Sequence, residues 1–213
     1  MEFITKLVTY MIDNSGHLLA LSIEHLLMVG YGIGLALIVG IPLGIIAAKF
    51  EKLAPIIIAL SNVLQLIPSL AMLAILMLYF GFGFNTIVIG LFLYSLLPIV
   101  KNTYVGIKEV DESIIESGIG SGMTTMQLLR KIQFPLSIPF LLAGIRLAAV
   151  IAISVAAIGP YIGAGGLGSE IVSGISLQND VMIYAGAIPA TLIAIVADFI
   201  LGKIENKTKK RLI

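Results

Sequence analysis

The chain contains no cysteine and no tryptophan, and only 25 of its 213 residues carry a formal charge. The absence of cysteine excludes disulfide bonds, thiolate metal sites and thiol catalysis. Charged residues make up 12% of the sequence, whereas soluble globular domains have about 25%. So few charges cannot coat a water-soluble protein of this size, which excludes a soluble enzyme. The net charge of +1 supplies no basic field for nucleic acid, so no nucleic-acid partner is expected.

Hydrophobic residues, by contrast, are abundant and stand in long runs. They make up 59% of the chain, and 48 consecutive residues between Lys52 and Lys101 carry no formal charge. One helical crossing of a bilayer takes about 20 residues, so this run is long enough for two. The sequence predicts an all-α membrane protein with about five transmembrane helices. The expected spans are residues 26–48, 54–80, 86–104, 136–161 and 181–202.

The basic residues predict how these spans are oriented. Lys and Arg concentrate on the cytoplasmic side of membrane proteins. With the N-terminus outside, 12 of the 13 basic residues are counted on the cytoplasmic side, Lys101 and Arg146 among them from within expected spans, and only Lys6 lies outside. The expected parts are an extracytoplasmic segment at 1–18, a transmembrane domain at 19–202 and a basic cytoplasmic tail at 203–213. Because five spans enclose little pathway alone, a second chain, identical or similar, is expected beside this one.

A polar segment at residues 111–135 separates the third and fourth spans. Its pattern predicts two short amphipathic helices joined by a turn, although an ordinary interfacial loop would share this periodicity. The expected helix caps are Asp111 or Ser113 and Thr124 or Thr125, with the turn at Gly120 and Gly122 and the second helix ending at Pro135.

The spacing within this segment resembles the EAA motif of the membrane subunits of binding-protein-dependent ABC importers. That motif reads Glu-Ala-Ala, three residues, Gly, nine residues, Ile, one residue, Leu-Pro. The matching positions here are Glu116, Ser117, Gly118, Gly122, Ile132 and Phe134-Pro135. The resemblance implies a coupling helix that docks on a separate ATP-binding subunit. The chain itself has no Walker A sequence, so ATP and magnesium are expected in that partner, and no cofactor and no enzymatic activity are expected in this chain.

Three further segments, 65–71, 94–103 and 158–168, resemble permeases for glycine betaine, carnitine and choline, and this resemblance extends over 19–202. It implies a type I ABC importer permease fold, a multi-pass location in a bacterial cell membrane, and an extracytoplasmic solute-binding protein. The implied function is ATP-driven import of these osmoprotectants under hyperosmotic stress. The alternatives are an ABC permease for another solute, through amino-acid import or bile-salt exclusion, and, less favoured, an ion-coupled secondary transporter.

Several residues are candidates for roles in such a pathway. Polar or helix-breaking side chains inside spans are expected to line it, although the two prolines could be packing kinks; the candidates are Gln65, Pro68, Ser69, Tyr94 and Pro98. A glycine-rich segment after the fourth span is expected to form a loop at the outer mouth, with a plain flexible loop as the alternative; its glycines are Gly163, Gly165, Gly166 and Gly168.

Two smaller features of the spans lead to expectations about packing. Small residues at four-residue spacing favour close helix contact, which is expected for Gly30 with Gly34 and for Gly40 with Gly44. An acid near the inner end of the fifth span, Asp198, is expected to be an interfacial charge that Lys203, Arg146 or water satisfies. The lack of tryptophan argues against a high-affinity aromatic cage for a quaternary ammonium group in this subunit.

Overall fold

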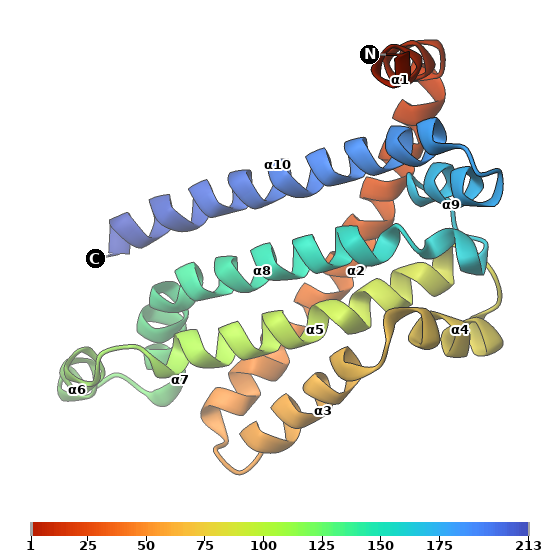
Figure 1. Cartoon of the computed structure of the whole chain (residues 1–213). Coiled ribbons are helices and arrows are strands. Elements are labelled where there is room, and N and C mark those ends of the chain that lie inside the picture. The colour runs from red at the N-terminus through yellow and green to blue at the C-terminus, as the bar shows by residue number, and fades with distance from the viewer. Residues whose placement is uncertain (1, 213) are drawn as a thin grey trace.

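The computed structural model describes residues 2–212, with side chains described through Lys210, and every regular element in that part is a helix. Four helices are long and apolar enough to cross a membrane, and Figure 1 shows them grouped in one bundle. They are α2 (Ser15–Lys49), α5 (Phe84–Lys108), α8 (Phe134–Ala156, helical with its preceding turns from Thr125) and α10 (Asp180–Leu212). The first span therefore begins well before residue 26.

The remaining candidate span, the second along the chain, is broken in the middle. Residues 54–80 form two helices, α3 (Ala54–Leu66) and α4 (Ser69–Phe80), whose axes differ by 97°. The break follows from Pro68, which has no N–H to donate and disfavours a helical residue before it. Ile67 accordingly has an extended ψ of 130°, and the hydroxyl of Tyr94 on α5 donates to its carbonyl. With this bent pair counted as one, the prediction of about five spans is confirmed.

A row of small residues brings α2 close to α5 at the centre of the bundle. Gly32, Ala36, Gly40 and Gly44 follow one another at four-residue spacing and are all buried. A Cβ atom added at Gly32 would lie 2.6 Å from the Cβ of Leu91, so only a small residue fits there. We call these four residues the α2 seam.

The α2 seam contains only one of the two glycine pairs that were expected to pack. Gly40 and Gly44 belong to it, but a Cβ at Gly30 or Gly34 would meet nothing within 4 Å. The helix advances about 100° per residue, so residues 30 and 34 point away from the face that residue 32 presents to α5. Four-residue spacing alone cannot say which of two such rows is the packed one.

Short elements gather at the two ends of the bundle, and Figure 1 shows which lie at each. One end, called the motif end, carries the polar segment and the C-terminus; the opposite end, called the glycine-loop end, carries the glycine-rich segment. At the motif end lie α6 (Glu112–Gly120), α7 (Thr125–Leu128) and a π turn at Leu129–Gln133. Near the other end lie α1 (Glu2–Asp13), α4, a 3-10 turn at Gly159–Ile162 and α9 (Gly168–Ser176).

Pro135 does not end a helix, contrary to expectation. The chain stays helical from Thr125 to Ala156, and Pro135 stands in the first turn of α8. The π turn immediately before it widens the helix, and such turns accommodate interruptions of the regular hydrogen-bond ladder. The second short helix of the polar segment and the next span are thus one continuous helix.

Candidate functional site

The polar segment at the motif end is capped by its own side chains. The carboxylate of Asp111 accepts a hydrogen bond from the amide of Ser113 at 2.8 Å, and hydrogen bonding to the Ser113 side chain and amide holds the Asp111 pKa below its usual value. The next helix starts with a capping box, in which Thr124 and Gln127 each accept from the other's amide. Of the alternatives left open by the sequence, Asp111 and Thr124 are therefore the caps.

Gly122 gives this segment its turn. Its φ is +79°, a conformation that glycine adopts without steric cost. The amide of Gly122 donates to the carbonyl of Ile119 at 2.9 Å, and the amide of Met123 donates to the carbonyl of Gly118 at 3.1 Å. This pair of bonds is the Schellman ending of α6. It explains why the motif has a glycine at this position.

Gly118 joins the two halves of the motif. It is buried, and an added Cβ would lie 2.5 Å from the Cδ2 of Leu128 and 2.9 Å from the Cδ1 of Ile132. Ile132 is itself half-buried in the π turn. The spacing between the small residue and the isoleucine therefore places them in direct contact, so that α6 lies flat on the turn that leads into α8.

The opposite face of this hairpin is open. Glu116 and Ser117 are exposed, as are the apolar side chains of Ile119 and Met126. Two cavities flank the hairpin. One, of about 480 Å³, is lined by residues of α5, α6, α8 and α10 that include Glu109, Asp111, Phe140, Glu205 and Lys209. The other, of about 270 Å³, lies between α2, α5, α6 and the turns before α8, and its lining includes Lys49, Ile115 and Gln133.

The pathway candidates separate into two groups. Gln65 and Ser69 are half-buried at the bend between α3 and α4, and Pro68 between them is exposed. Tyr94 and Pro98 are buried inside α5, where Tyr94 reaches the bend through its bond to Ile67.

One polar residue of α3 escaped the sequence analysis. Asn62 is exposed on this membrane-embedded helix, and its side chain makes no hydrogen bond within residues 2–210. It lies one helical turn from Gln65, because residues three apart share a helix face. That relation to Gln65 was the signal available in the sequence.

The glycine-rich segment is fastened to α2 by a long-range bond. The amide of Gly166 donates to the carboxylate of Glu24 at 2.9 Å. A Cβ at Gly165 would collide with that carboxylate, and one at Gly168 would collide with the carbonyl of Ala157. Beneath the segment, His25 is fully buried, with Nε2 3.1 Å from the carbonyl of Ile153. Gly163, by contrast, is exposed at the end of the 3-10 turn.

Asp198 finds a partner among those expected. Arg146 on α8 holds it with two hydrogen bonds, at 2.5 and 2.8 Å, and also reaches Glu205 at 3.5 Å. These contacts tie the middle of α8 to α10. Within residues 2–212 no group of three or more His, Asp or Glu side chains is placed to hold a metal ion.

The geometry at the motif end agrees with what a comparison of the whole sequence finds. The family described as "Binding-protein-dependent transport system inner membrane component" matches residues 40–210. The chain belongs to this family. It is therefore a membrane-embedded transport subunit and not an enzyme.

Relatives of this family member cover nearly its whole length. It is 48% identical, over 97% of its own length and 90% of the relative's, to the OpuCD permease protein of the glycine betaine/carnitine/choline transport system of Bacillus subtilis. It is 50% identical, over 97% of its length and 93% of the relative's, to the carnitine transport permease protein OpuCD of Listeria monocytogenes.

A solved structure supports the fold of this permease. The chain superposes on the MetNI methionine ABC transporter in an inward-facing conformation with a TM-score of 0.80, at 20% identity, over 90% of this chain and 95% of that one. The likeness identifies the fold as that of a type I ABC importer permease. A permease of this fold works with ATPase, solute-binding and second permease partners.

Proposed function

We propose that this chain forms part of the pathway for ATP-driven import of quaternary ammonium osmoprotectants, namely glycine betaine, carnitine and choline, under hyperosmotic stress. The observation that carries the proposal is the identity of 48–50% over 97% of the chain to permeases named for these solutes. An identity of about half over nearly the whole chain supports the same class of solute.

The direction of the chain in the membrane is part of this proposal. The motif end faces the cytoplasm and the glycine-loop end faces outward, in line with the distribution of Lys and Arg. ATP and magnesium act in a separate ATP-binding subunit, which docks on the open face of α6. A solute-binding protein meets the outer end, where Gly163, Gly165, Gly166 and Gly168 form the loop at the mouth.

The pathway is proposed to run along the bend between α3 and α4. Gln65, Pro68 and Ser69 lie there, and Asn62 extends the polar row by one turn. An amide left facing hydrocarbon would lose its hydrogen bonds with water at considerable cost, so this face meets water or a second permease, identical or paralogous. Tyr94 acts behind the bend by holding the carbonyl of Ile67, and Pro98 lies one turn further along α5.

Solute uptake into proteoliposomes tests the function. The permease is reconstituted with its co-purified partners and a solute-binding protein, with the ATPase facing the inside of the vesicles. Uptake of labelled glycine betaine is then measured with and without ATP inside. We expect ATP-dependent uptake that carnitine or choline competes. Uptake of an amino acid instead, with none of these solutes transported, would contradict the proposed solute class but leave the family intact.

A charge reversal tests the docking face. Glu116→Lys changes an exposed position of the motif, and Glu112→Lys makes the same change on the same helix outside the motif. We expect the first variant to weaken ATPase binding about tenfold or more, because a reversed charge at an interface is repulsive, and the second to bind normally. Equal retention of the ATPase by both variants would place the contact elsewhere.

A further inference from the structure

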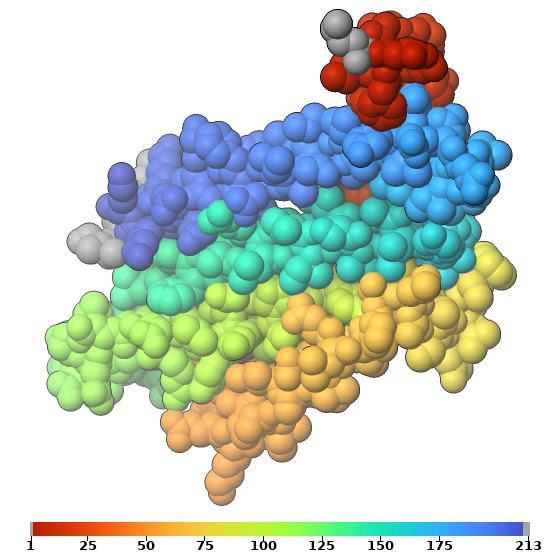
Figure 2. Space-filling model, in the orientation of Figure 1, coloured from red at the N-terminus to blue at the C-terminus, as the bar shows by residue number. Residues whose placement is uncertain are grey.

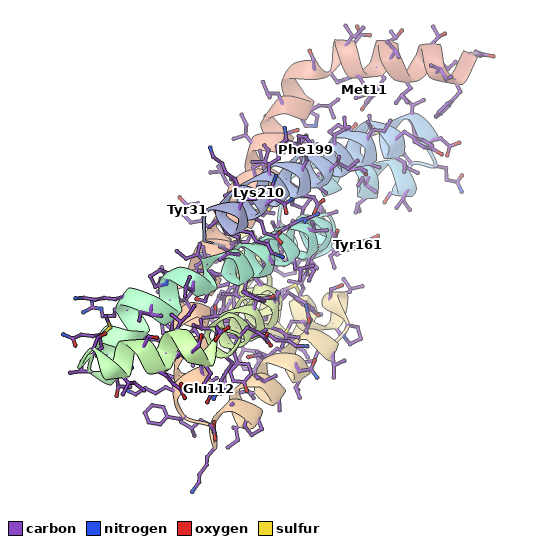
Figure 3. The ribbon with its side chains drawn as sticks, turned by 90° about the vertical axis from the view of Figure 1, so that its left-hand side faces the viewer. Met11, Tyr31, Glu112, Tyr161, Phe199 and Lys210 are labelled. Atoms are coloured by element: carbon purple, nitrogen blue, oxygen red, sulfur yellow. The ribbon has the colours of Figure 1, made fainter. Side chains whose placement is uncertain are left out.

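The N-terminal helix α1 is set apart from the bundle. It has 12 residues, too few to cross a bilayer. Figure 1 shows it nearly end-on beside the start of α10, whereas Figure 3, turned by 90°, shows it along its length with Met11 on it. Its axis therefore runs crosswise to the spanning helices. Figure 2 shows it projecting from the side of the bundle rather than covering its end.

One side of α1 is fixed against the protein. Leu7 is buried with Leu18 of α2 and Ala185 of α10. The hydroxyl of Tyr10 donates to the carboxylate of Glu170, which is only 4% exposed. The ring of Phe3 packs edge-on against Tyr184, with 5.3 Å between centroids. Because three side chains of α1 are held, the helix cannot turn about its axis, and its outward side is defined.

That outward side carries an apolar row. Ile4, Val8 and Ile12 follow at four-residue spacing and are exposed by 65%, 50% and 65%, so they line one face of the helix. We call them the α1 stripe. Lys6, Thr9 and Asp13 are exposed on another side. The helix is thus amphipathic beyond what its packing against α10 requires.

We propose that α1 is an interfacial anchor whose stripe lies in the lipid of the outer leaflet, at the boundary between headgroups and acyl chains. The occupant follows from continuity with the surfaces beside it. Only 28% of the most apolar window of α2 and 17% of that of α10 is buried, and the exposed side chains near α1 include Leu19, Ile23 and Leu192. These spans meet lipid, and a crosswise amphipathic helix at their outer ends meets the same lipid.

The charges of α1 indicate what kind of lipid contact this is. Glu2 and Lys6 pair at 2.7 Å, and Asp13 leaves the helix with one net negative charge. Anionic headgroups therefore offer it no attraction, so that the apolar row, rather than a basic patch, holds the helix to the membrane. The outer location rests on the orientation given under the proposed function.

Spin labelling tests the anchor, because the chain has no cysteine of its own. Val8→Cys places a label on the stripe, and Thr9→Cys, the next residue, is the matched control on the polar side. Each variant of the full chain is assembled with cysteine-free partners in liposomes. Accessibility is then measured to oxygen, which concentrates in lipid, and to a water-soluble nickel chelate. Ile12→Cys repeats the stripe measurement one turn on.

We expect the labels at positions 8 and 12 to be at least about threefold more accessible to oxygen than to the chelate, after normalisation to free label, and the label at position 9 to show the reverse order. A stripe label open to the chelate would mean that the stripe faces water, and one closed to both reagents would mean that a protein partner covers it. Either result overturns the anchor. Solute uptake by the same liposomes is scored separately, so failure of the proposed solute class is distinguishable from failure of the anchor.

Discussion

Both ends of the bundle are shaped by glycines, but the glycines do different work. At the motif end, Gly122 supplies the backbone conformation of a turn. The hydrogen bonds that close this turn join residues at most five apart in sequence. At the glycine-loop end, Gly166 is bonded to Glu24, 142 residues away, and Gly168 lies against the backbone of Ala157. The motif end is stabilised by contacts between residues that are close in sequence. The glycine-loop end is stabilised by contacts between distant segments, so it forms only when the bundle is assembled.

The largest expected effect comes from filling the space at the glycine-loop end. Gly168→Val would drive a side chain into the carbonyl of Ala157, so we expect a loss of about 3 kcal/mol or more of stability. Gly120→Val at the motif end meets nothing within 4 Å and should change stability by less than about 1 kcal/mol, because valine has a higher helix propensity than glycine. Unfolding by denaturant in detergent compares the two. Equal losses of stability in the two variants would mean that the two ends do not differ in this respect.

A smaller effect is expected from cutting the long-range bond. Glu24→Ala leaves the amide of Gly166 without its acceptor, and a buried donor left unpaired costs about 1–3 kcal/mol. Glu24→Gln keeps an acceptor oxygen and serves as the control. Hydrogen exchange read by mass spectrometry should show faster exchange over residues 163–168 in the first variant, with the motif end unchanged. Faster exchange at both ends would mean that the loop and the motif are not independent.

The local end should respond only locally. Thr124→Ala removes one half of the capping box and should cost about 1 kcal/mol, confined to residues 124–133. Thr125→Ala, beside it and outside the box, is the control. Proteolysis at the motif end, followed over time, should be faster in the first variant alone. If both variants are cut at the wild-type rate, the cap does not stabilise this segment.

The smallest expected effect is a pH response near the glycine-loop end. Three effects raise the pKa of Tyr10 to about 12: its hydrogen bond to Glu170, its partial burial and the negative charge of Glu170. Because the folded pKa lies above the unfolded one, the contact stabilises the docked α1 below the unfolded value and is lost as the pH rises through about 12. The difference in ultraviolet absorbance between wild type and Tyr10→Phe measures this titration. A midpoint at the ordinary tyrosine value would show that the bond is absent.

Sequence reasoning went furthest where the determinants were local. Hydropathy predicted the long helices, and the residue pattern over 111–135 predicted two short helices with a cap at each. It could not distinguish the α2 seam from the row of Gly30 and Gly34, because both have four-residue spacing and only the position of α5 decides between them. It likewise missed the bond from Gly166 to Glu24, since nothing near either residue encodes a partner so distant in the chain.

The sequence also could not predict how sharply the chain changes direction at Pro68. A proline in an apolar run is compatible with a gentle kink, as Pro98 shows within the unbroken helix α5. At residue 68 the freed carbonyl of Ile67 finds the hydroxyl of Tyr94, which stabilises a full change of direction.

The α2 seam has a consequence for biosynthesis. During translation α2 enters the bilayer before α5 has been made, so its close-packing face has no partner at that time. The seam consists of glycine and alanine and carries no polar side chain. Exposure of this face to lipid therefore leaves no hydrogen-bonding group without a partner. The pair then forms by van der Waals fit alone once α5 has inserted, which orders the assembly of the bundle along the chain.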